Sequence, residues 1–186
     1  GALSLLEMAH ADHGDLPWSA AFEGAIALAR EGYPLTGRTH KYIHGSHPQS
    51  GAPDVQAIFR MPNGELAREG DRFVNAAYAD TLEKIARGGT TAFYDSDEIA
   101  GEIVGKTHRD PLPGTITRDD LRDYRALRTT PVCRPYRTYV VCVPPPPSSG
   151  VAVLQILGIL EGTDIDRRGP DDAQGWFLFA EASRLA

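Results

Sequence analysis

This 186-residue sequence is poor in several features that would point to particular classes of protein. It contains only two cysteines, two methionines and two tryptophans, and its net charge is −6. Lys and Arg do not cluster, whereas a nucleic-acid-binding surface is usually basic, so no nucleic-acid partner is expected. The longest apolar run, residues 151–160, is interrupted by Gln155 and is too short to cross a bilayer, so no membrane partner is expected.

The two cysteines, Cys133 and Cys142, flank a predicted hairpin. Two cysteines are too few for a disulfide framework or a zinc cage. A cross-strand bridge between them is compatible with the pattern. We favour the alternative that both are reduced, partly buried thiols, since free cysteine behaves as a small hydrophobic residue.

The remaining composition is that of a globular chain. The hydrophobic fraction is 41% and the charged fraction 24%. This is enough apolar material for a core that does not need disulfide bridges. Both ends lie inside helical patterns, at residues 3–9 and 176–185, whereas domains usually end in polar linkers. We therefore expect one helix-rich fragment, residues 1–186, of a larger protein.

Apolar periodicity predicts a mainly helical fold of the α+β class. Helical spacing covers residues 3–12, 18–30, 74–87 and 90–106, and Thr117 is a good N-cap for a further short helix. Glycines at positions 32, 88 and 89 are expected to end two of these helices. Val74, Tyr78, Leu82 and Ile85 share one face of the helix predicted over residues 74–87. Residues 36–70, rich in Gly, Ser, Pro and His, predict a loop with at most short helical turns.

The pattern changes after residue 126. Residues 127–132 and 138–143 predict two strands that turn around residues 135–137. Four prolines, residues 144–147, predict an extended strut. An apolar helix over residues 151–161 follows, and its all-round apolar composition predicts burial. The hairpin and strut together occupy about residues 126–150.

The most distinctive stretch ends this strut and consists of Pro145, Pro146, Pro147, Ser148, Ser149 and Gly150. Ser148 or Ser149 is expected to cap the following helix, whose first N–H groups could hold an anion or a partner's carboxylate. A structural corner is the preferred interpretation. A nucleophilic serine is rejected because the strand-turn-helix motif requires Gly-x-Ser-x-Gly. A ligand for proline-reading modules is rejected because no disordered context surrounds the prolines.

Three histidines and a threonine pair suggest chemistry that other patterns explain better. His40, His44 and His47 have partial metal-ligand spacing, but the Glu of the zinc-protease pattern is missing, so solvated loop histidines are favoured over a metal site. Thr90 and Thr91 follow two glycines and open a helix, so capping is favoured over nucleophilic catalysis. Nothing matches a phosphate loop or a dinucleotide fingerprint, so no cofactor is expected.

Several segments, in one order along nearly the whole chain, resemble the gamma-glutamyltranspeptidase family. They are GDLPW (14–18) with AIALAREGY (25–33), FY (93–94) with EIA (98–100), TITRDDLRDY (115–124), YRTYV (136–140), PPPSSG (145–150), LQIL (154–157) and ILEG (159–162). Two departures are the extra Pro144 and Val151, which stands where the family has a second glycine. They leave open whether the parent is a transpeptidase, a hydrolase or a cephalosporin acylase.

The resemblance implies a helical lobe, with one β-hairpin, of the large subunit of an N-terminal-nucleophile hydrolase. Such an enzyme transfers a gamma-glutamyl group from glutathione-type amides to amino acids, peptides or water. The nucleophile is the N-terminal Thr of a small subunit, and Thr90-Thr91 continues with Ala92 where that Thr is followed by His. No catalytic, substrate-binding or metal residue is therefore carried over, and the chain alone is expected to be inactive.

The implied partners are the remainder of the large subunit and the small subunit, in a bacterial periplasm or cytoplasm. An apolar patch is expected near residues 138–160, and it offers a surface for a homodimer. Two other hypotheses stay open. One is an autonomous scaffold or partner-binding module that uses the Pro-Ser-Ser-Gly corner, and the other is a small metal-dependent hydrolase that uses the histidines at 40–47.

Overall fold

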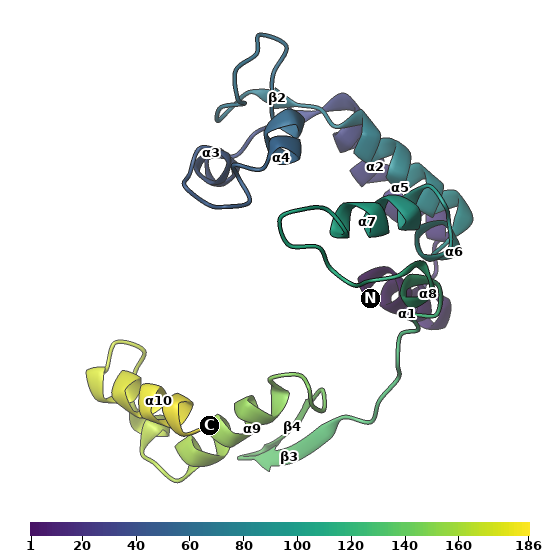
Figure 1. Cartoon of the computed structure of the whole chain (residues 1–186). Coiled ribbons are helices and arrows are strands. Elements are labelled where there is room, and N and C mark those ends of the chain that lie inside the picture. Colours follow the sequence, from purple (N-terminus) through teal and green to yellow (C-terminus); the bar gives the residue numbers. More distant parts are fainter. The chain divides into compact units, whose positions relative to one another are not determined.

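The computed structural model describes all 186 residues and divides them into two compact units, Gly1–Ala126 and Leu127–Ala186 (Figure 1). The sequence pattern predicts a single fragment. The division falls where the predicted hairpin region begins. Residues 124–131 adopt no regular secondary structure, so few backbone hydrogen bonds tie this connection to either side.

Unit 1 is helical, with one small strand pair. Its elements are α1 (Ala2–His13), η1 (Trp18–Phe22), α2 (Glu23–Glu31), β1 (Tyr33–Pro34), α3 (Gly37–Ile43), α4 (Pro53–Ile58), β2 (Arg72–Phe73), α5 (Ala76–Gly88), α6 (Thr91–Tyr94), α7 (Ile99–Thr107) and α8 (Arg118–Arg122). Residues 36–70, expected to be a loop with short turns, contain the short helices α3 and α4.

Local capping sets the ends of the helices in unit 1. The Asn75 side chain accepts from the Tyr78 N–H at 2.9 Å and begins α5. Gly32 and Gly89 follow α2 and α5 with φ values of 86° and 63°, which glycine adopts without steric cost. The single helix expected over residues 90–106 is instead two, because the Ser96 hydroxyl accepts from the Ile99 N–H at 3.0 Å and starts a new helix.

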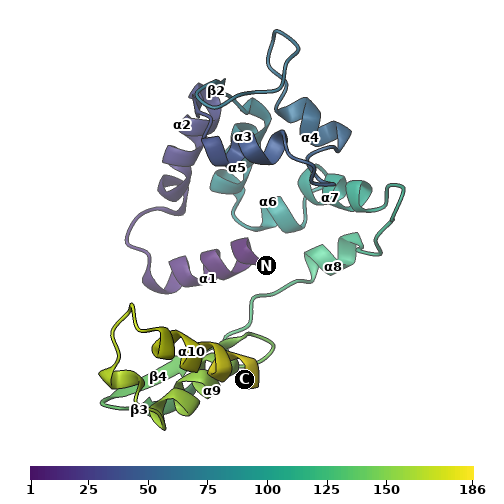
Figure 2. The ribbon, with the colours of Figure 1, turned by 90° about the vertical axis from the view of Figure 1, so that its left-hand side faces the viewer.

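Helices α2 and α5 pack side by side (Figure 2). Ala29, Ala79, Leu82 and Ile85 are buried at this contact, and the Trp18 indole N–H donates to the Ile85 carbonyl at 3.2 Å. Val74 and Tyr78, which share the predicted helix face with Leu82 and Ile85, are 47% and 54% exposed. Only the second half of that face, with Leu82 and Ile85, is therefore buried.

A second apolar cluster lies under residues 35–73. Leu35, Ile43, Ala67 and Phe73 are buried together. The Phe59 ring stacks on that of Phe73 with centroids 4.9 Å apart, a geometry that adds to simple area burial. Strands β1 and β2 pair antiparallel, with position 33 opposite Phe73. This cluster gives the irregular 36–70 region its fixed place in unit 1.

Unit 2 consists of a hairpin and two helices. Strands β3 (Val132–Tyr136) and β4 (Tyr139–Val143) pair antiparallel, and α9 (Gly150–Glu161), η2 (Ile165–Arg167) and α10 (Ala173–Leu185) follow. Figure 1 shows α9 along the hairpin and α10 against α9. The second strand matches its prediction. The first begins later than expected, because the turn lies at residues 137–138, where Arg137 has a φ of 53°.

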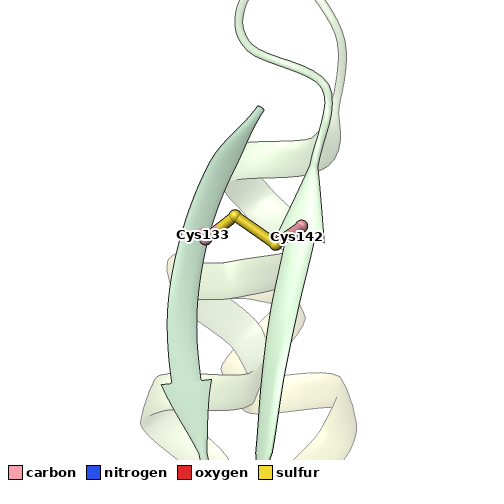
Figure 3. Close-up of a disulfide and its surroundings, with 2 residues drawn as sticks. All are labelled: Cys133 and Cys142. Atoms are coloured by element: carbon pink, nitrogen blue, oxygen red, sulfur yellow. A yellow bond between two sulfur atoms is a disulfide. The ribbon is translucent and has the colours of Figure 1, made fainter. Parts of the chain in front are cut away.

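Cys133 and Cys142 form a disulfide across the hairpin (Figure 3). The prediction of two reduced thiols is therefore wrong. The register decides the outcome, because it places the two cysteines directly opposite each other, with Cα atoms 4.1 Å apart. Such close separations belong to the non-hydrogen-bonded positions of an antiparallel pair, where side chains approach most closely.

Much apolar surface of unit 2 is open. Helix α9, expected to be buried all round, buries Leu154 and Leu160 but leaves Val153 45% exposed. On the hairpin, Tyr139 and Val140, which lie in the range of the expected apolar patch, are 71% and 67% exposed. None of the helices in either unit combines the length and apolar character needed to cross a membrane.

Candidate functional site

The proline run turns before it reaches α9. The Ser148 N–H, the first backbone donor after the prolines, donates to the Pro145 carbonyl at 3.3 Å. This bond closes a turn over residues 145–148. The predicted strut is therefore wrong in its second half, because a chain that returns to make this bond is not extended there.

The two serines of this corner occupy the start of α9 without capping it. Ser149 is the N-cap residue, but its side chain accepts no hydrogen bond from the helix, so the expected capping is not observed. Both Ser148 and Ser149 are exposed. Their hydroxyl groups therefore face solvent and are available to another molecule.

Gly150 fixes the angle between β4 and α9. A Cβ atom at this position would lie 2.6 Å from Val143 Cβ and 2.7 Å from the Pro144 carbonyl oxygen. Only glycine permits this approach of the helix start to the strand end. At the other end of α9, the Glu161 carboxylate accepts from the Arg137 N–H in the hairpin turn at 2.8 Å. The hairpin is thus attached to both ends of α9.

A second candidate arrangement surrounds Thr90 in unit 1. The Thr90 N–H donates to one carboxylate oxygen of Glu7 at 2.9 Å, and the Thr90 hydroxyl donates to the other at 2.5 Å. Capping of α6 by the Thr90 hydroxyl was expected. The hydroxyl instead binds Glu7 of α1. The Thr90 nitrogen is a peptide amide, whose delocalised lone pair cannot act as the base that a free α-amino group provides.

The three loop histidines have separate roles. His40 and His44 lie close, with ring centroids 4.4 Å apart, and the His44 Nε2–H donates to the Ala67 carbonyl at 3.1 Å. His47 instead stacks on Tyr42. No group of three or more His, Cys, Asp or Glu residues is arranged to hold a metal ion. The contacts of His44 and His47 tie the 36–70 region together.

Carboxylates at helix starts are placed for structure. Asp120 and Thr117 form a reciprocal capping box at α8, and hydrogen bonds from the Thr117 hydroxyl and N–H lower the pKa of Asp120. The N–H groups of Gly175 and Gln174 lower the pKa of Asp172 at the start of α10. Both shifts follow from hydrogen bonds to the charged form.

The sequence singled out Thr90 but did not predict its contact with Glu7. Glu7 had no special pattern, and it lies 83 positions before its partner Thr90. Tyr94, which is buried, stacks on Tyr124 with centroids 5.7 Å apart. No local signal joins residues so distant, so only the tertiary structure brings α1, α6 and the segment after α8 to one place.

Comparisons with known proteins agree over the whole chain. The family model described as Gamma-glutamyltranspeptidase matches residues 1–186. The glutathione hydrolase proenzyme of Escherichia coli (strain K12) is 33% identical over 189 residues, which cover 100% of this chain and 32% of that protein. The acylase ACY 1 proenzyme of Pseudomonas sp. (strain V22) is 33% identical over 190 residues, covering 100% of this chain and 33% of that protein.

A solved structure shows the same fold. The gamma-glutamyltranspeptidase of Helicobacter pylori superposes with a TM-score of 0.87 at 28% identity, over 99% of this chain and 52% of that one. The chain thus spans about a third of the length of the curated relatives named above.

Proposed function

Because this chain belongs to the gamma-glutamyltranspeptidase family, we propose that it is an internal part of the large subunit of a gamma-glutamyl-transferring enzyme and is inactive alone. The match over residues 1–186 supports the family. The proposal that the activity needs further chain is supported by the share of the relatives covered, which is 32% for the Escherichia coli protein. Two relatives named proenzymes support a parent that is processed into subunits.

In the proposed parent, an N-terminal threonine outside these residues attacks the carbonyl carbon of a gamma-glutamyl amide. Its oxygen forms an ester, the carbon–nitrogen bond breaks, and the amine leaves with a proton. An amino group of an amino acid or peptide, or a water molecule, then attacks the ester and releases the threonine. Glutathione-type amides are the proposed donors, in keeping with the name of the Escherichia coli relative.

The environment of Thr90 carries the proposal that this chain has no nucleophile of its own. Its nitrogen is an amide committed to Glu7, and its hydroxyl is bound to the same carboxylate. A carboxylate is a far weaker base than the hydroxyl's conjugate base, so it does not deprotonate the threonine. Ser148 and Ser149 are exposed, and the Ser149 side chain makes no capping hydrogen bond.

An activity assay tests this proposal. The purified chain is incubated with a gamma-glutamyl anilide, and release of the aniline is followed by absorbance. We expect a rate equal to that of buffer alone. Saturable turnover that disappears in Thr90→Ala, while Thr91→Ala retains it, would identify an internal threonine nucleophile and overturn the proposal. Circular dichroism of both variants verifies that they are folded.

We further propose that unit 2 presents the surface on which the remaining large subunit and the small subunit pack. Supporting observations are the exposed Tyr139 and Val140 on the hairpin and the exposed hydroxyls of Ser148 and Ser149. In the isolated chain the same apolar patch is expected to form a homodimer. Light scattering measures the molar mass, and Tyr139→Ser with Val140→Ser is expected to restore a monomer. A monomeric unsubstituted chain would contradict this expectation.

The exposed serines also favour the second candidate, an autonomous module that binds a partner through the Pro-Ser-Ser-Gly corner. The two candidates are separated by the reading frame after Ala186. A downstream Thr-Thr-His sequence supports the enzyme, whereas a stop codon directly after Ala186 supports the module.

A further inference from the structure

Unit 1 contains a polar pocket of about 360 Å³ between α1, α6 and the segment after α8. Its walls include Glu7, Thr90, Tyr94, Asp95, Arg122 and Arg125. The stacked rings of Tyr94 and Tyr124 form part of the wall. The cavity thus combines two acids, two guanidinium groups and two aromatic rings, and it is large enough for a small organic molecule.

Two of these charged side chains already have partners within unit 1. Glu7 accepts both hydrogen bonds of Thr90. Arg122 forms ion pairs with Asp119 at 2.8 Å and Asp123 at 3.1 Å. These groups shape the pocket but have little remaining capacity to bind a ligand.

Arg125 differs from Arg122 because no carboxylate is paired with it. Its Nη1 donates to the carbonyls of Arg122 and Tyr124, each at 2.7 Å. These two bonds hold the guanidinium in place while the Nε and Nη2 groups make no bond within the protein. That free edge has two parallel N–H donors, the geometry that matches a carboxylate.

Asp95 provides the opposite charge without a partner. Its backbone carbonyl accepts from Arg118, but its carboxylate forms no ion pair. The pKa of Arg122 is raised first by its hydrogen bond to Asp123, then by the charges of Asp119 and Asp123, and also by Asp95. Asp95 therefore lies within electrostatic reach of Arg122, which lines the same pocket.

We propose that this pocket binds a small zwitterion, a free α-amino acid or a dipeptide. Arg125 would bind its carboxylate and Asp95 its ammonium group. One cation and one anion whose side chains have no side-chain partner, in a cavity of this volume, fit a ligand that carries both charges. A ligand with a single charge would leave one of the two groups without a partner.

The test compares the binding of four probes that carry both charges or only one of them: glycine, glycylglycine, N-acetylglycine and glycinamide. Each is titrated into the full ¹⁵N-labelled chain, and amide shifts are followed. We expect glycine or glycylglycine to shift resonances of residues 4–7, 90–95 and 122–125, and the stronger of the two identifies amino acid or dipeptide as the ligand. N-acetylglycine and glycinamide each lack one charge and are expected to bind about tenfold more weakly, the loss of one charge-assisted contact.

Two variants assign each charge to its residue. Arg125→Gln is expected to weaken glycine and N-acetylglycine but not glycinamide, and Asp95→Asn is expected to weaken glycine and glycinamide but not N-acetylglycine. A merely structural role would weaken all probes alike. Arg109→Gln, an exposed arginine outside the pocket, is the matched control and is expected to bind like the unsubstituted chain.

Two results would overturn the proposal. One is the absence of saturable shifts with glycine and glycylglycine at tens of millimolar. The other is equal binding of all four probes, which would show that neither charge is recognised. Shifts confined to residues outside the pocket would likewise overturn the proposal.

Discussion

Unit 1 and unit 2 bury their apolar residues in different ways. Unit 1 brings together residues far apart in sequence, such as Leu35, Ile43 and Phe73. Unit 2 buries Leu154, Leu160 and Ala182 but leaves Trp176 62% exposed. A unit of about 60 residues buries only about 60% of its unfolded surface. Unit 1 is therefore held by its core, whereas unit 2 depends on a covalent bridge and on surface that another molecule can cover.

The largest expected effect tests the core of unit 1. Phe73→Ala removes a buried ring that stacks on Phe59, and such substitutions cost about 3–5 kcal/mol of unfolding free energy. Hydrogen exchange is expected to accelerate throughout unit 1 and to stay unchanged in unit 2. Leu112→Ala, at an 88% exposed position, is the control. Equal acceleration in both units would contradict their independence.

Removal of the disulfide is expected to act on unit 2 alone. The bridge closes a loop of about ten residues, for which the chain-entropy relation gives about 2–3 kcal/mol. Cys133→Ala with Cys142→Ala is expected to lower the melting temperature of unit 2, measured by hydrogen exchange against temperature. A reducing agent should reproduce the shift in the unsubstituted chain and cause none in the double variant. A loss of protection in unit 1 would refute the assignment.

Gly150→Ala probes the corner between β4 and α9. The new Cβ would meet Val143 Cβ and the Pro144 carbonyl within 2.7 Å, so the helix start must move, at about 1–3 kcal/mol. We expect faster exchange at the start of α9. Gly169→Ala is a matched control in the same unit, since no atom lies within 4 Å of its added Cβ. Similar behaviour of the two variants would show that the close approach is not required.

Thr117→Ala removes one half of the α8 capping box, and the expected loss is about 1 kcal/mol. Denaturant unfolding measures it, with the exposed Thr115→Ala as control. The effect should be smaller than that of Phe73→Ala and restricted to unit 1. A Thr117→Ala variant as stable as the control would mean that α8 is held by its packing and not by its cap.

Acid is expected to have the smallest and least selective effect, since both units contain capped helix starts. Hydrogen bonds lower the folded-state pKa values of Asp120 and Asp172 below their ordinary value. Each carboxylate therefore stabilises its unit above the unfolded pKa, near pH 4, and this contribution is lost as the pH falls through the lowered pKa. Unfolding followed from pH 6 to pH 2 is expected to show decreasing stability in both units. Stability that rises on acidification would contradict the sign.

Local patterns predicted the elements whose signals lie within a few residues. The Thr117 cap, the glycine ends of α2 and α5, and strand β4 were confirmed. The family resemblance was confirmed over the whole chain. Prediction failed where long-range packing decided the outcome. Periodicity placed Tyr78 on one helix face with Leu82 and Ile85, but only the latter two are buried.

The candidate site was predicted only in part. The sequence singled out residues 145–150 as a corner, but a glycine's close contact with Val143 is a property of the folded chain. The pairing of Glu7 with Thr90 and the free edge of Arg125 depend on segments that no sequence spacing connects. The state of Cys133 and Cys142 likewise followed from strand register, which a two-residue shift of the turn would have changed.

The Glu7 carboxylate also bears on the order in which unit 1 assembles. Helix α1 has no buried residue of its own, and its bonds run to Thr90 and, through Ser4, to Ala126, which lies 122 positions away. Contacts of such separation form only after the intervening chain has been gathered. Helix α1 is thus expected to dock last, and its amides should gain protection later than those of α5 in pulse-labelled refolding.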